Sequence, residues 1–380
     1  MARAEVAAVK CDSYDPAQVQ SAVDRAFRLL GGIERLVSGR CLLKPNLLSP
    51  SPAPRAITTH PAVVAAVGRS VTALGLDVYA GDSPGRGDSM RAAEVSGVAE
   101  ACRQAGVQVV AFDEEVNVKH PSGLVCKEFT LAREVSEANA IVNIPKMKTH
   151  AFLAYTGAVK NLLGCIPGTR KANAHLRYPG SREFSLMLLD LLALLKPAVS
   201  VLDAIVAMDR NGPSQGRPRR FGAVLASTDA VALDTVALHL ARVDPMLVPY
   251  LRAARELGVG QTRLQDIDVV GDPLETLAVD DFQMPDSVGA PSLLRFGTRI
   301  RKLVTAVPSI ERSTCTGCGE CVRSCPPQAV TVSAGKASID YSSCIRCYCC
   351  HEMCPDGAVR LSRGRLARLT GLVLDAFDRR

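Results

Sequence analysis

Eight cysteines near the C-terminal end of the chain repeat one spacing twice, and this pattern constrains the fold more than any other feature. The two runs are Cys315, Cys318, Cys321 and Cys325, followed by Pro326, and Cys344, Cys347, Cys350 and Cys354, followed by Pro355. The spacing Cys-x-x-Cys-x-x-Cys-x-x-x-Cys-Pro is that of the [4Fe–4S] ligands in bacterial-type ferredoxins. We therefore expect a small iron–sulfur module that transfers single electrons.

The two runs are copies of one unit, offset by 29 residues (344 against 315). In this motif the fourth cysteine of a run binds the cluster of the other run. We therefore expect one cluster on Cys315, Cys318, Cys321 and Cys354, and a second on Cys344, Cys347, Cys350 and Cys325. Zinc is the alternative, because cysteine pairs also bind zinc, although runs of three suit two tetrahedral sites poorly. The ninth cysteine of this region, Cys349, is interpreted as a spare buried thiol rather than a ligand.

The composition describes a globular chain with a modest positive charge. Of its 380 residues, 47% are hydrophobic and 22% charged, which allows about two or three packed domains. The formal charge of +7 is interpreted as solvated faces and compensation for bound clusters, with an anionic substrate or an acidic redox partner as the sharper alternative. Nothing matches a nucleic-acid recognition module. We therefore expect a redox protein partner and a small anionic ligand, and no nucleic acid.

The cysteine content and the lack of a recognisable targeting segment both bear on the cellular location of the protein. Nine of the 14 cysteines lie between residues 315 and 354, and open thiolates need a reducing compartment. The N-terminal residues contain no uninterrupted apolar region of a secretory signal. No apolar segment reaches the length of about 18 residues that a membrane span needs, and the nearest, 184–195, contains Asp190. We expect a soluble cytoplasmic protein without membrane insertion.

Short β-branched runs alternate with longer helical patterns over residues 1–290. Strands are expected at 5–9, 41–43, 77–79, 108–112, 140–144, 199–202, 223–226 and 267–270, and helices at 16–31, 61–74, 90–105, 151–163, 182–195, 229–242 and 246–257. This alternation predicts an α/β fold with a doubly wound, mostly parallel sheet. A linker is expected at 291–310, a small α+β two-cluster ferredoxin-like domain at 311–362, and a C-terminal helix at 363–380.

Polar residues follow several of the expected strands, and ligands of doubly wound sheets bind beyond the carboxyl ends of strands. The candidate binding residues are Lys44, Asn46, Asp82, Ser83, Lys148, Asn161, Asp203, Asn211 and Asp229. The candidate catalytic residues are His150, Lys160 and Lys146. The lysines favour a carboxylate or phosphate ligand, and a histidine can donate a proton near neutral pH. The alternatives are ordinary ones: Asp229 as a helix cap, and His150 as a cap or core residue.

Seven short motifs along the α/β region form a set. They are KPN at 44–46, GDS at 81–83, PKMKTH at 145–150, VKNLLG at 159–164, DAI at 203–205, NGP at 211–213 and ASTDAVALD at 226–234. As a set they resemble the family known as domain of unknown function 362, over about residues 5–270. Members that resemble this chain carry a C-terminal two-cluster ferredoxin domain, so the resemblance implies this architecture and assigns no reaction.

Two functions follow from the fusion of a redox module with a polar α/β site. The first is an iron–sulfur oxidoreductase that passes electrons through two [4Fe–4S] clusters to or from a small anionic substrate or an organic cofactor. The second is a non-catalytic electron carrier or adaptor subunit of a larger redox complex. A nucleic-acid protein with structural clusters is a distant third. The partial Gly-rich stretch 85–87 and the lack of a Walker motif disfavour NAD and ATP, whereas a flavin stays open.

Overall fold

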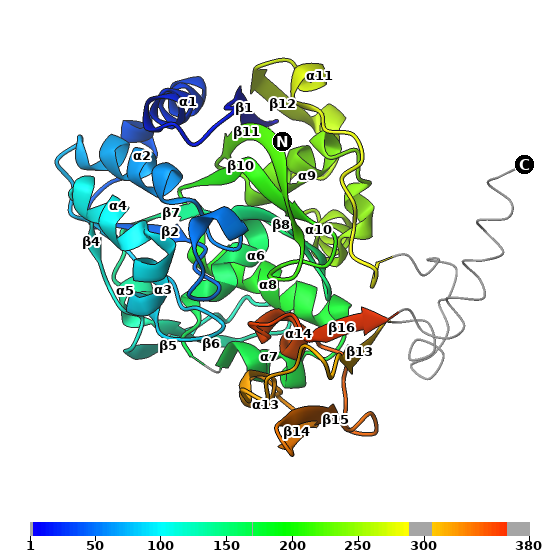
Figure 1. Ribbon diagram of the computed structural model, residues 1–380. Coiled ribbons are helices and arrows are strands. Elements are labelled where there is room, and N and C mark those ends of the chain that lie inside the picture. Colours follow the sequence, from blue (N-terminus) through cyan, green and yellow to red (C-terminus); the bar gives the residue numbers. More distant parts are fainter. Residues whose placement is uncertain (1–2, 169, 289–305, 363–380) are drawn as a thin grey trace, which may run out of the picture.

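The computed structural model describes residues 3–168, 170–288 and 306–362 (Figure 1). A ten-stranded sheet forms its centre, with eight strands in the order β12-β1-β11-β10-β7-β2-β3-β4. These strands are β1 (Ala4–Lys10), β2 (Cys41–Pro45), β3 (Val78–Ala80), β4 (Gln108–Val109), β7 (Ala140–Ile144), β10 (Val199–Asp209), β11 (Arg217–Ser227) and β12 (Ile267–Gly271). Among these eight strands only β11 runs antiparallel to its neighbours, β1 and β10, so the predicted mostly parallel sheet is confirmed.

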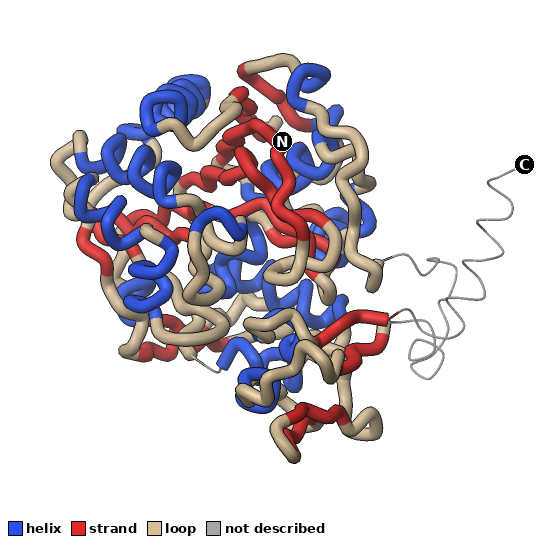
Figure 2. The backbone as a smooth tube through the Cα atoms, viewed as in Figure 1, coloured by secondary structure: helices blue, strands red, loops and turns tan. Residues whose placement is uncertain are grey.

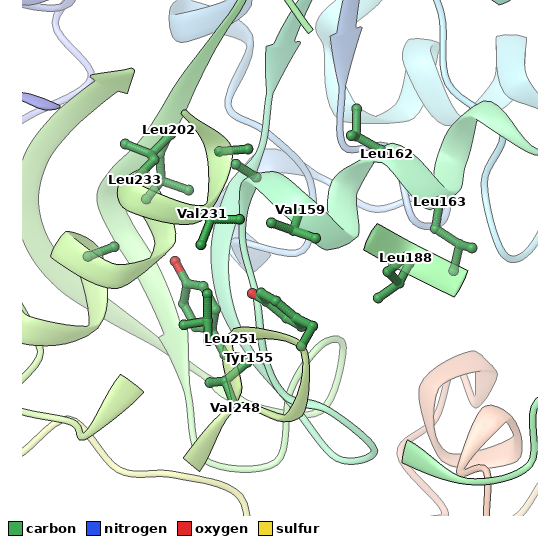
Figure 3. Packing of buried hydrophobic residues seen from close by; sticks show 14 of the residues in the cluster. Tyr155, Val159, Leu162, Leu163, Leu188, Leu202, Val231, Leu233, Val248 and Leu251 are labelled. Atoms are coloured by element: carbon green, nitrogen blue, oxygen red, sulfur yellow. The ribbon is translucent and has the colours of Figure 1, made fainter. Parts of the chain in front are cut away.

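Helices cover both faces of this sheet (Figure 2). One face packs against α1 (Pro16–Leu29), α2 (Pro61–Thr72) and α4 (Val98–Gln104), and the other against α6 (Ala158–Asn161), α8 (Ser181–Leu195), α9 (Ala230–Leu240) and α10 (Pro249–Leu257). Neighbouring strand residues alternate between the two cores: Leu42 joins the α8–α10 side and Leu43 the α1–α2 side. This is the period of two that a doubly covered sheet requires. Figure 3 shows Leu202 of β10 beside Val231 and Leu233 of α9 in the core on the α8–α10 side.

Three segments differ from the expected elements. The expected helix at 90–105 is two helices, α3 (Ser89–Ser96) and α4, because Gly97 between them adopts a φ of 80°. The segment expected as a polar loop after β7 is strand β8 (Lys146–His150), which pairs with β10 and with β9 (Ala154–Thr156). The expected helix at 151–163 therefore begins only at α6. The alternation of Lys146, Lys148 and His150 with Met147 and Thr149 is typical of a strand. It was interpreted as a loop because buried lysines are not expected in a strand.

Two further elements were not expected from the sequence. A hairpin of β5 (Glu115–Lys119) and β6 (Glu128–Ala132) lies beside α5 (Arg133–Ser136). Helix α7 (Arg170–Arg177) precedes α8, and Figure 1 shows it next to the cysteine-rich module. The remaining short elements are α11 (Leu274–Leu277) and five 3₁₀ turns at Ile33–Arg35, Ala53–Arg55, Leu162–Cys165, Pro245–Leu247 and Leu264–Asp266. No helix in the described ranges is both long and apolar enough to span a membrane.

The cysteine-rich module is a compact unit of two small hairpins and two short helices. Its elements are β13 (Val307–Ile310), α13 (Glu320–Arg323), β14 (Val330–Ser333), β15 (Lys336–Ile339), α14 (Cys349–Met353) and β16 (Val359–Ser362). Strand β13 pairs with β16, so residues 307–310 of the expected linker are part of the module. Residues 291–305 of the expected linker and the expected helix at 363–380 lie outside the described residues.

The module packs on the turn between β10 and β11. Ser214 Oγ donates a hydrogen bond to Glu352 O (2.6 Å), and Gln215 Nε2 donates to Cys354 O (2.5 Å). His351 Nε2 lies 3.1 Å from Asn211 O. Two of these contacts use the backbone oxygens of Glu352 and Cys354, and the third uses the His351 ring. Together they fix the cysteine-bearing segment against the α/β domain.

Candidate functional site

The cysteines of the first predicted set surround one small cavity. Cys315, Cys318, Cys321 and Cys354 line it together with Gly317 and Gly319. Gly317 has a φ of +72°, and a Cβ there would lie 2.4 Å from Gly335 O, so only glycine permits this close approach. Cys354 comes from the second run, and its place among the first three cysteines is the crossed arrangement that the motif predicts.

The second set is also close together. Burial, followed by the neighbouring Cys347, Cys344 and Cys325, raises the pKa of Cys350 well above its ordinary value. Within the described ranges no three His, Cys, Asp or Glu side chains converge on a point that would hold a single metal ion. Cysteines spread around a space fit a cubane, in which each thiolate binds a different iron, better than one tetrahedral ion.

Backbone amides already point at three of the cysteine sulfurs. Ala329 N donates to Cys325 Sγ (3.2 Å), Ala337 N to Cys315 Sγ (3.4 Å) and Ala358 N to Cys354 Sγ (3.2 Å). Such hydrogen bonds stabilise thiolate ligands and tune the potential of the cluster that they hold. The residues present therefore fit iron–sulfur clusters.

A larger cavity of about 450 Å³ lies between the module and the edge of the central sheet. From the α/β domain it is lined by Asn46, Leu48, Asp82, Ser83, Pro84, Gly85, Arg86, Gly87, Thr156, Lys160, Asn161, Leu163, Gly164, Gly168, Lys171, Ala172 and His175. From the module it is lined by Glu320, Arg323, Ser324, Cys349, Glu352 and Met353. Its size is that of a small-molecule site. Five predicted residues meet here: Asn46, Asp82, Ser83, Lys160 and Asn161.

Helix α6 carries two of these residues, and a carboxylate from another helix caps it. Asp234 of α9 accepts hydrogen bonds from Ala158 N (2.7 Å) and Val159 N (3.1 Å), and from Tyr250 Oη (3.0 Å). Burial raises the pKa of Asp234 to about 7 despite these bonds. Because α6 is a single turn, this cap determines where Lys160 is presented.

Lys160 is the predicted catalytic residue that reaches the cavity. Its ammonium makes no hydrogen bond or ion pair with the described residues, and it is partly exposed to the cavity. Burial lowers its pKa, and the charge of Glu352 opposes this effect. An unpaired ammonium of this kind can bind an anion or donate a proton.

Asp82 lines the cavity as half of a buried ion pair. Lys44 Nζ lies 2.7 Å from Asp82 Oδ1, and both side chains are at most 3% exposed. Leu47 N donates to Asp82 Oδ2 (2.6 Å). A Cβ on Gly164 would lie 1.9 Å from Asp82 Oδ1, so the chain following α6 must have glycine here. Lys44 therefore neutralises Asp82 from behind the cavity wall.

A chain of side-chain amides fixes the two asparagines. Asn46 Nδ2 donates to Asn161 Oδ1 (3.0 Å), and Asn161 Nδ2 donates to Asn143 Oδ1 (2.8 Å). Lys148 Nζ donates to Asn46 Oδ1 (2.7 Å) and to Ile57 O (2.6 Å). Burial lowers the pKa of Lys148 well below its usual value. Lys148 thus orients Asn46 and does not itself line the cavity.

Lys146 and Asp203 form a separate buried group away from the cavity. Lys146 Nζ donates to Asp203 Oδ2 (2.8 Å) and to Tyr14 Oη (2.6 Å), and Tyr14 Oη donates to Asp203 Oδ1 (2.9 Å). His60 stacks on the Tyr14 ring at 3.5 Å and donates its backbone N–H to Asp203 Oδ2. The charges of Lys146 and Asp203 are therefore paired with each other inside the protein.

His150 lies behind the cavity wall and contacts the module. Its Nε2 is 2.8 Å from Glu352 Oε1, and its Nδ1 accepts from Phe152 N and Leu153 N. Burial lowers the pKa of His150 to about 4, so the ring is neutral at pH 7 with its proton on Nε2. His150 therefore orients Glu352, which does line the cavity.

Asn211 and Asp229 lie outside the cavity. Asn211 Nδ2 donates to Asp286 Oδ2 (2.8 Å), and its backbone O contacts the module. Asp229 is the N-cap of α9 and accepts from Val231 N and Ala232 N.

Residues 41–239 match a family model described as domain of unknown function (DUF362), and residues 307–355 match the 4Fe-4S dicluster domain. A thylakoid-associated protein of Synechocystis sp. is 33% identical over 298 residues, covering 76% of this chain and 92% of that protein. The chain belongs to the DUF362 family. The sequence resemblance is thereby confirmed, together with the iron–sulfur module.

Solved structures are more distant from this DUF362 protein. The lactate racemase apoprotein from Thermoanaerobacterium thermosaccharolyticum has a TM-score of 0.39 at 11% identity, over 60% of this chain and 55% of that one. A protein from Thermotoga maritima has a TM-score of 0.36 at 12% identity, over 58% of this chain and 57% of that one. The family description assigns no reaction.

Helix α7 of this DUF362 protein adds two residues to the cavity that were not predicted from the sequence. Lys171 Nζ donates to Ser83 Oγ (2.5 Å), Ser83 O (2.9 Å) and Ile166 O (3.1 Å), and burial lowers its pKa to about 7. His175, four residues on, stacks on Phe184 at 4.4 Å. The signal was a basic pair at i, i+4 between two Gly-containing turns, a spacing that places both side chains on one helix face.

Proposed function

We propose that the chain is an iron–sulfur oxidoreductase that passes electrons through two [4Fe–4S] clusters to or from a small anionic substrate or an organic cofactor. The observation that carries this proposal is the shared cavity. One wall is the strand-end edge of the α/β domain and the other includes α14, the helix that contains the predicted cluster ligand Cys350. A ligand in this cavity lies directly beside the redox module, as short-range electron transfer requires.

We assign the clusters to the crossed sets. Cys315, Cys318, Cys321 and Cys354 hold one cluster, and Cys344, Cys347, Cys350 and Cys325 hold the other. The cavity that the first set lines and the closeness of Cys347, Cys344 and Cys325 to Cys350 support this assignment. The clusters supply one-electron chemistry. Every other step belongs to the side chains that bind the ligand, orient it and move a proton.

Lys160 is our choice for the proton donor and for stabilising negative charge on the ligand. It is the candidate whose ammonium faces the cavity without a partner among the described residues. His150 and Lys146, the other candidates, are both buried and hydrogen-bonded inside the protein, so we assign them to positioning. Asn46 and Asn161 supply fixed amides, and Leu48, Leu163 and Met353 exclude water from part of the wall.

The carrier or adaptor function is the competing proposal. It is favoured by Cys318, which is exposed, so one predicted cluster lies close to the surface where a redox protein can dock. A carrier needs this surface but no ligand in the cavity. The two proposals therefore differ in whether a small molecule in the cavity exchanges electrons with the clusters.

The experiment uses the full chain, purified and reconstituted without oxygen. Iron and sulfide analysis should return about eight of each per chain. The clusters are then reduced with dithionite, and their reoxidation is followed in the visible region with 2-oxoglutarate, pyruvate, 3-phosphoglycerate and flavin mononucleotide in turn. The oxidoreductase proposal expects saturable acceleration by at least one acceptor, and acceleration that Lys160→Met abolishes. A chain that exchanges electrons only with a protein acceptor is a carrier.

The location is also a proposal. Open thiolates favour a reducing compartment, which supports the cytoplasm. The relative from Synechocystis is named as thylakoid-associated, so association with a membrane surface is the competing location. Cell fractionation with immunodetection separates the two.

A further inference from the structure

The α7 end of the cavity contains a lysine whose charge is not balanced. Lys171 is held by three oxygens, and all three are neutral: Ser83 Oγ, Ser83 O and Ile166 O. The nearest carboxylate is that of Asp82, and it already pairs with Lys44 at 2.7 Å. An anion at this end would find a fixed ammonium and the Ser83 hydroxyl side by side.

A second unbalanced group lies at the end nearer the module. Lys160 makes no ion pair or hydrogen bond with the described residues. His175, from α7, is only 7% exposed, and its Nδ1 has no hydrogen-bond partner within the described residues. A buried polar atom without a partner costs free energy unless a ligand or a water molecule forms a hydrogen bond with it. Both side chains line the same cavity.

We propose that the cavity binds an organic acid with two separate anionic groups, one held by Lys171 and Ser83 and the other by Lys160 and His175. This inference rests on the proposed function for the identity of the cavity, and adds the class of the ligand. The lining of the same cavity also contains Leu48, Leu163 and Met353, whose apolar side chains suit a carbon chain. Gly85 keeps this wall open to Met353, because a Cβ there would lie 2.7 Å from Met353 Cε.

The negative residues of the cavity do not cancel this preference. Asp82 is paired with Lys44, and Glu320 with Arg323 at 2.7 Å. Glu352 directs its Oε1 to His150 at 2.8 Å. Lys160, Lys171 and Arg86 are left to meet an incoming ligand, so the lining has a surplus of positive charge.

Binding at the Lys171 end should take up a proton. Burial lowers the pKa of Lys171 to about 7, with Asp82, Lys44, Cys165 and Lys160 as the titratable groups that face it. An anion stabilises the ammonium, so the affinity should fall as the pH rises above about 7. Cys165 does not titrate in this range, because burial raises its pKa to about 12.

Calorimetric titration of the oxidised, cluster-loaded full chain tests the ligand class without any electron transfer. The probes are the linear dicarboxylates from malonate to pimelate, 3-phosphoglycerate, and butyrate as the single-acid control. We expect at least one two-acid probe to bind at least tenfold more tightly than butyrate. A dicarboxylate and 3-phosphoglycerate in separate arms distinguish a carboxylate from a phosphate at the second position.

Two variants test whether Lys171 and Ser83 hold one of the anionic groups. Lys171→Met should weaken the best probe about ten- to a hundredfold, the size of one charged hydrogen bond, and should remove the pH dependence of its binding. Ser83→Ala should weaken it less. Lys119→Met, an exposed lysine on β5, is the matched control and should bind normally. Visible spectra confirm that each variant retains its clusters.

Butyrate binding as tightly as every two-acid probe, no saturable binding by any probe, or unchanged binding by Lys171→Met would overturn the inference. A two-acid ligand that binds as expected but exchanges no electrons with the reduced clusters would instead refute the proposed function. The two failures are therefore distinguishable.

Discussion

Two groups of lysines lie near the same edge of the sheet, and they differ in what surrounds the ammonium. Lys146 lies against Asp203 and Tyr14, with its charge and its hydrogen bonds satisfied inside the protein. Lys160 and Lys171 lie in the cavity, one without a partner among the described residues and one with neutral acceptors only. The first arrangement stabilises the fold and the second leaves charge for a ligand. The residue type is the same in both groups, so the partners of the ammonium decide its role.

The largest effect is expected from breaking the buried pair. Asp203→Ala leaves the Lys146 ammonium, the Tyr14 hydroxyl and the His60 backbone N–H without their acceptor. Removing one partner of a buried ion pair costs about 3–5 kcal/mol in the free energy of unfolding. Chemical denaturation of the cluster-loaded protein measures this loss. Asp12→Ala, at an exposed carboxylate, is the control and should change stability by less than about 0.5 kcal/mol.

A second variant separates lost pairing from lost packing at this position. Combining Asp203→Ala with Lys146→Met removes the isolated charge, so part of the stability should return. A double variant as unstable as the sum of both single variants would show that the two groups do not interact, contrary to their 2.8 Å contact.

The next effect concerns the cavity lysine. Lys160→Met should leave unfolding almost unchanged, since no ion pair is lost, but should slow ligand-dependent reoxidation of the clusters. Loss of a proton donor of this kind costs about a hundredfold in rate, or about 2.7 kcal/mol of activation free energy. Stopped-flow spectroscopy at saturating acceptor measures the rate. Equal slowing by Lys146→Met would erase the distinction between the two groups.

A smaller effect is expected at the carboxylate that caps α6. Asp234→Ala removes the acceptor for Ala158 N and Val159 N and should cost about 1–2 kcal/mol of stability. Because the cap determines where Lys160 lies, acceptor binding should weaken as well. Asp229 caps α9 and does not line the cavity. Asp229→Ala should therefore lower the stability without a specific loss of binding. The ratio of binding loss to stability loss in the two variants is the measurement.

Much of the fold could be predicted from local pattern. The mostly apolar runs at 41–43 and 140–144 form buried parallel strands, and the helix beginning at Pro61 starts where proline favours a first turn. The strand at 146–150 could not be predicted in this way. Its lysines and histidine point into the protein, and the pairing with Asp203 and Glu352 that makes this tolerable comes from distant segments.

The same limit applies to the candidate site. Asn46, Asp82, Ser83, Lys160 and Asn161 were found because each follows a strand or lies on the next helix. Lys171 and His175 were missed, since α7 has no strand before it and its basic residues read as a solvated face. Glu352 and Cys349 were missed because nothing local indicates that the module closes the cavity. Tertiary packing supplied both walls.

The smallest expected effect is the pH dependence of stability that Lys171 contributes. Its pKa is lowered to about 7 in the folded protein, against about 10.4 in the unfolded chain, so between these values the unfolded chain binds more protons. Stability should therefore rise with pH between about 7 and 10, and Lys171→Met should remove this part of the rise. Screening by the cavity solvent reduces the contribution to about 1 kcal/mol between pH 7 and 9. Urea denaturation at pH 7, 8 and 9 measures the rise, and Lys119→Met, at an exposed lysine of β5, is the control that should leave it unchanged. A saturating two-acid ligand should flatten the same rise in the wild-type chain, because it keeps Lys171 protonated. The pH profile of stability thus reports whether the Lys171 charge is available to a ligand. The Lys146 charge is not, because it is paired with Asp203 inside the protein.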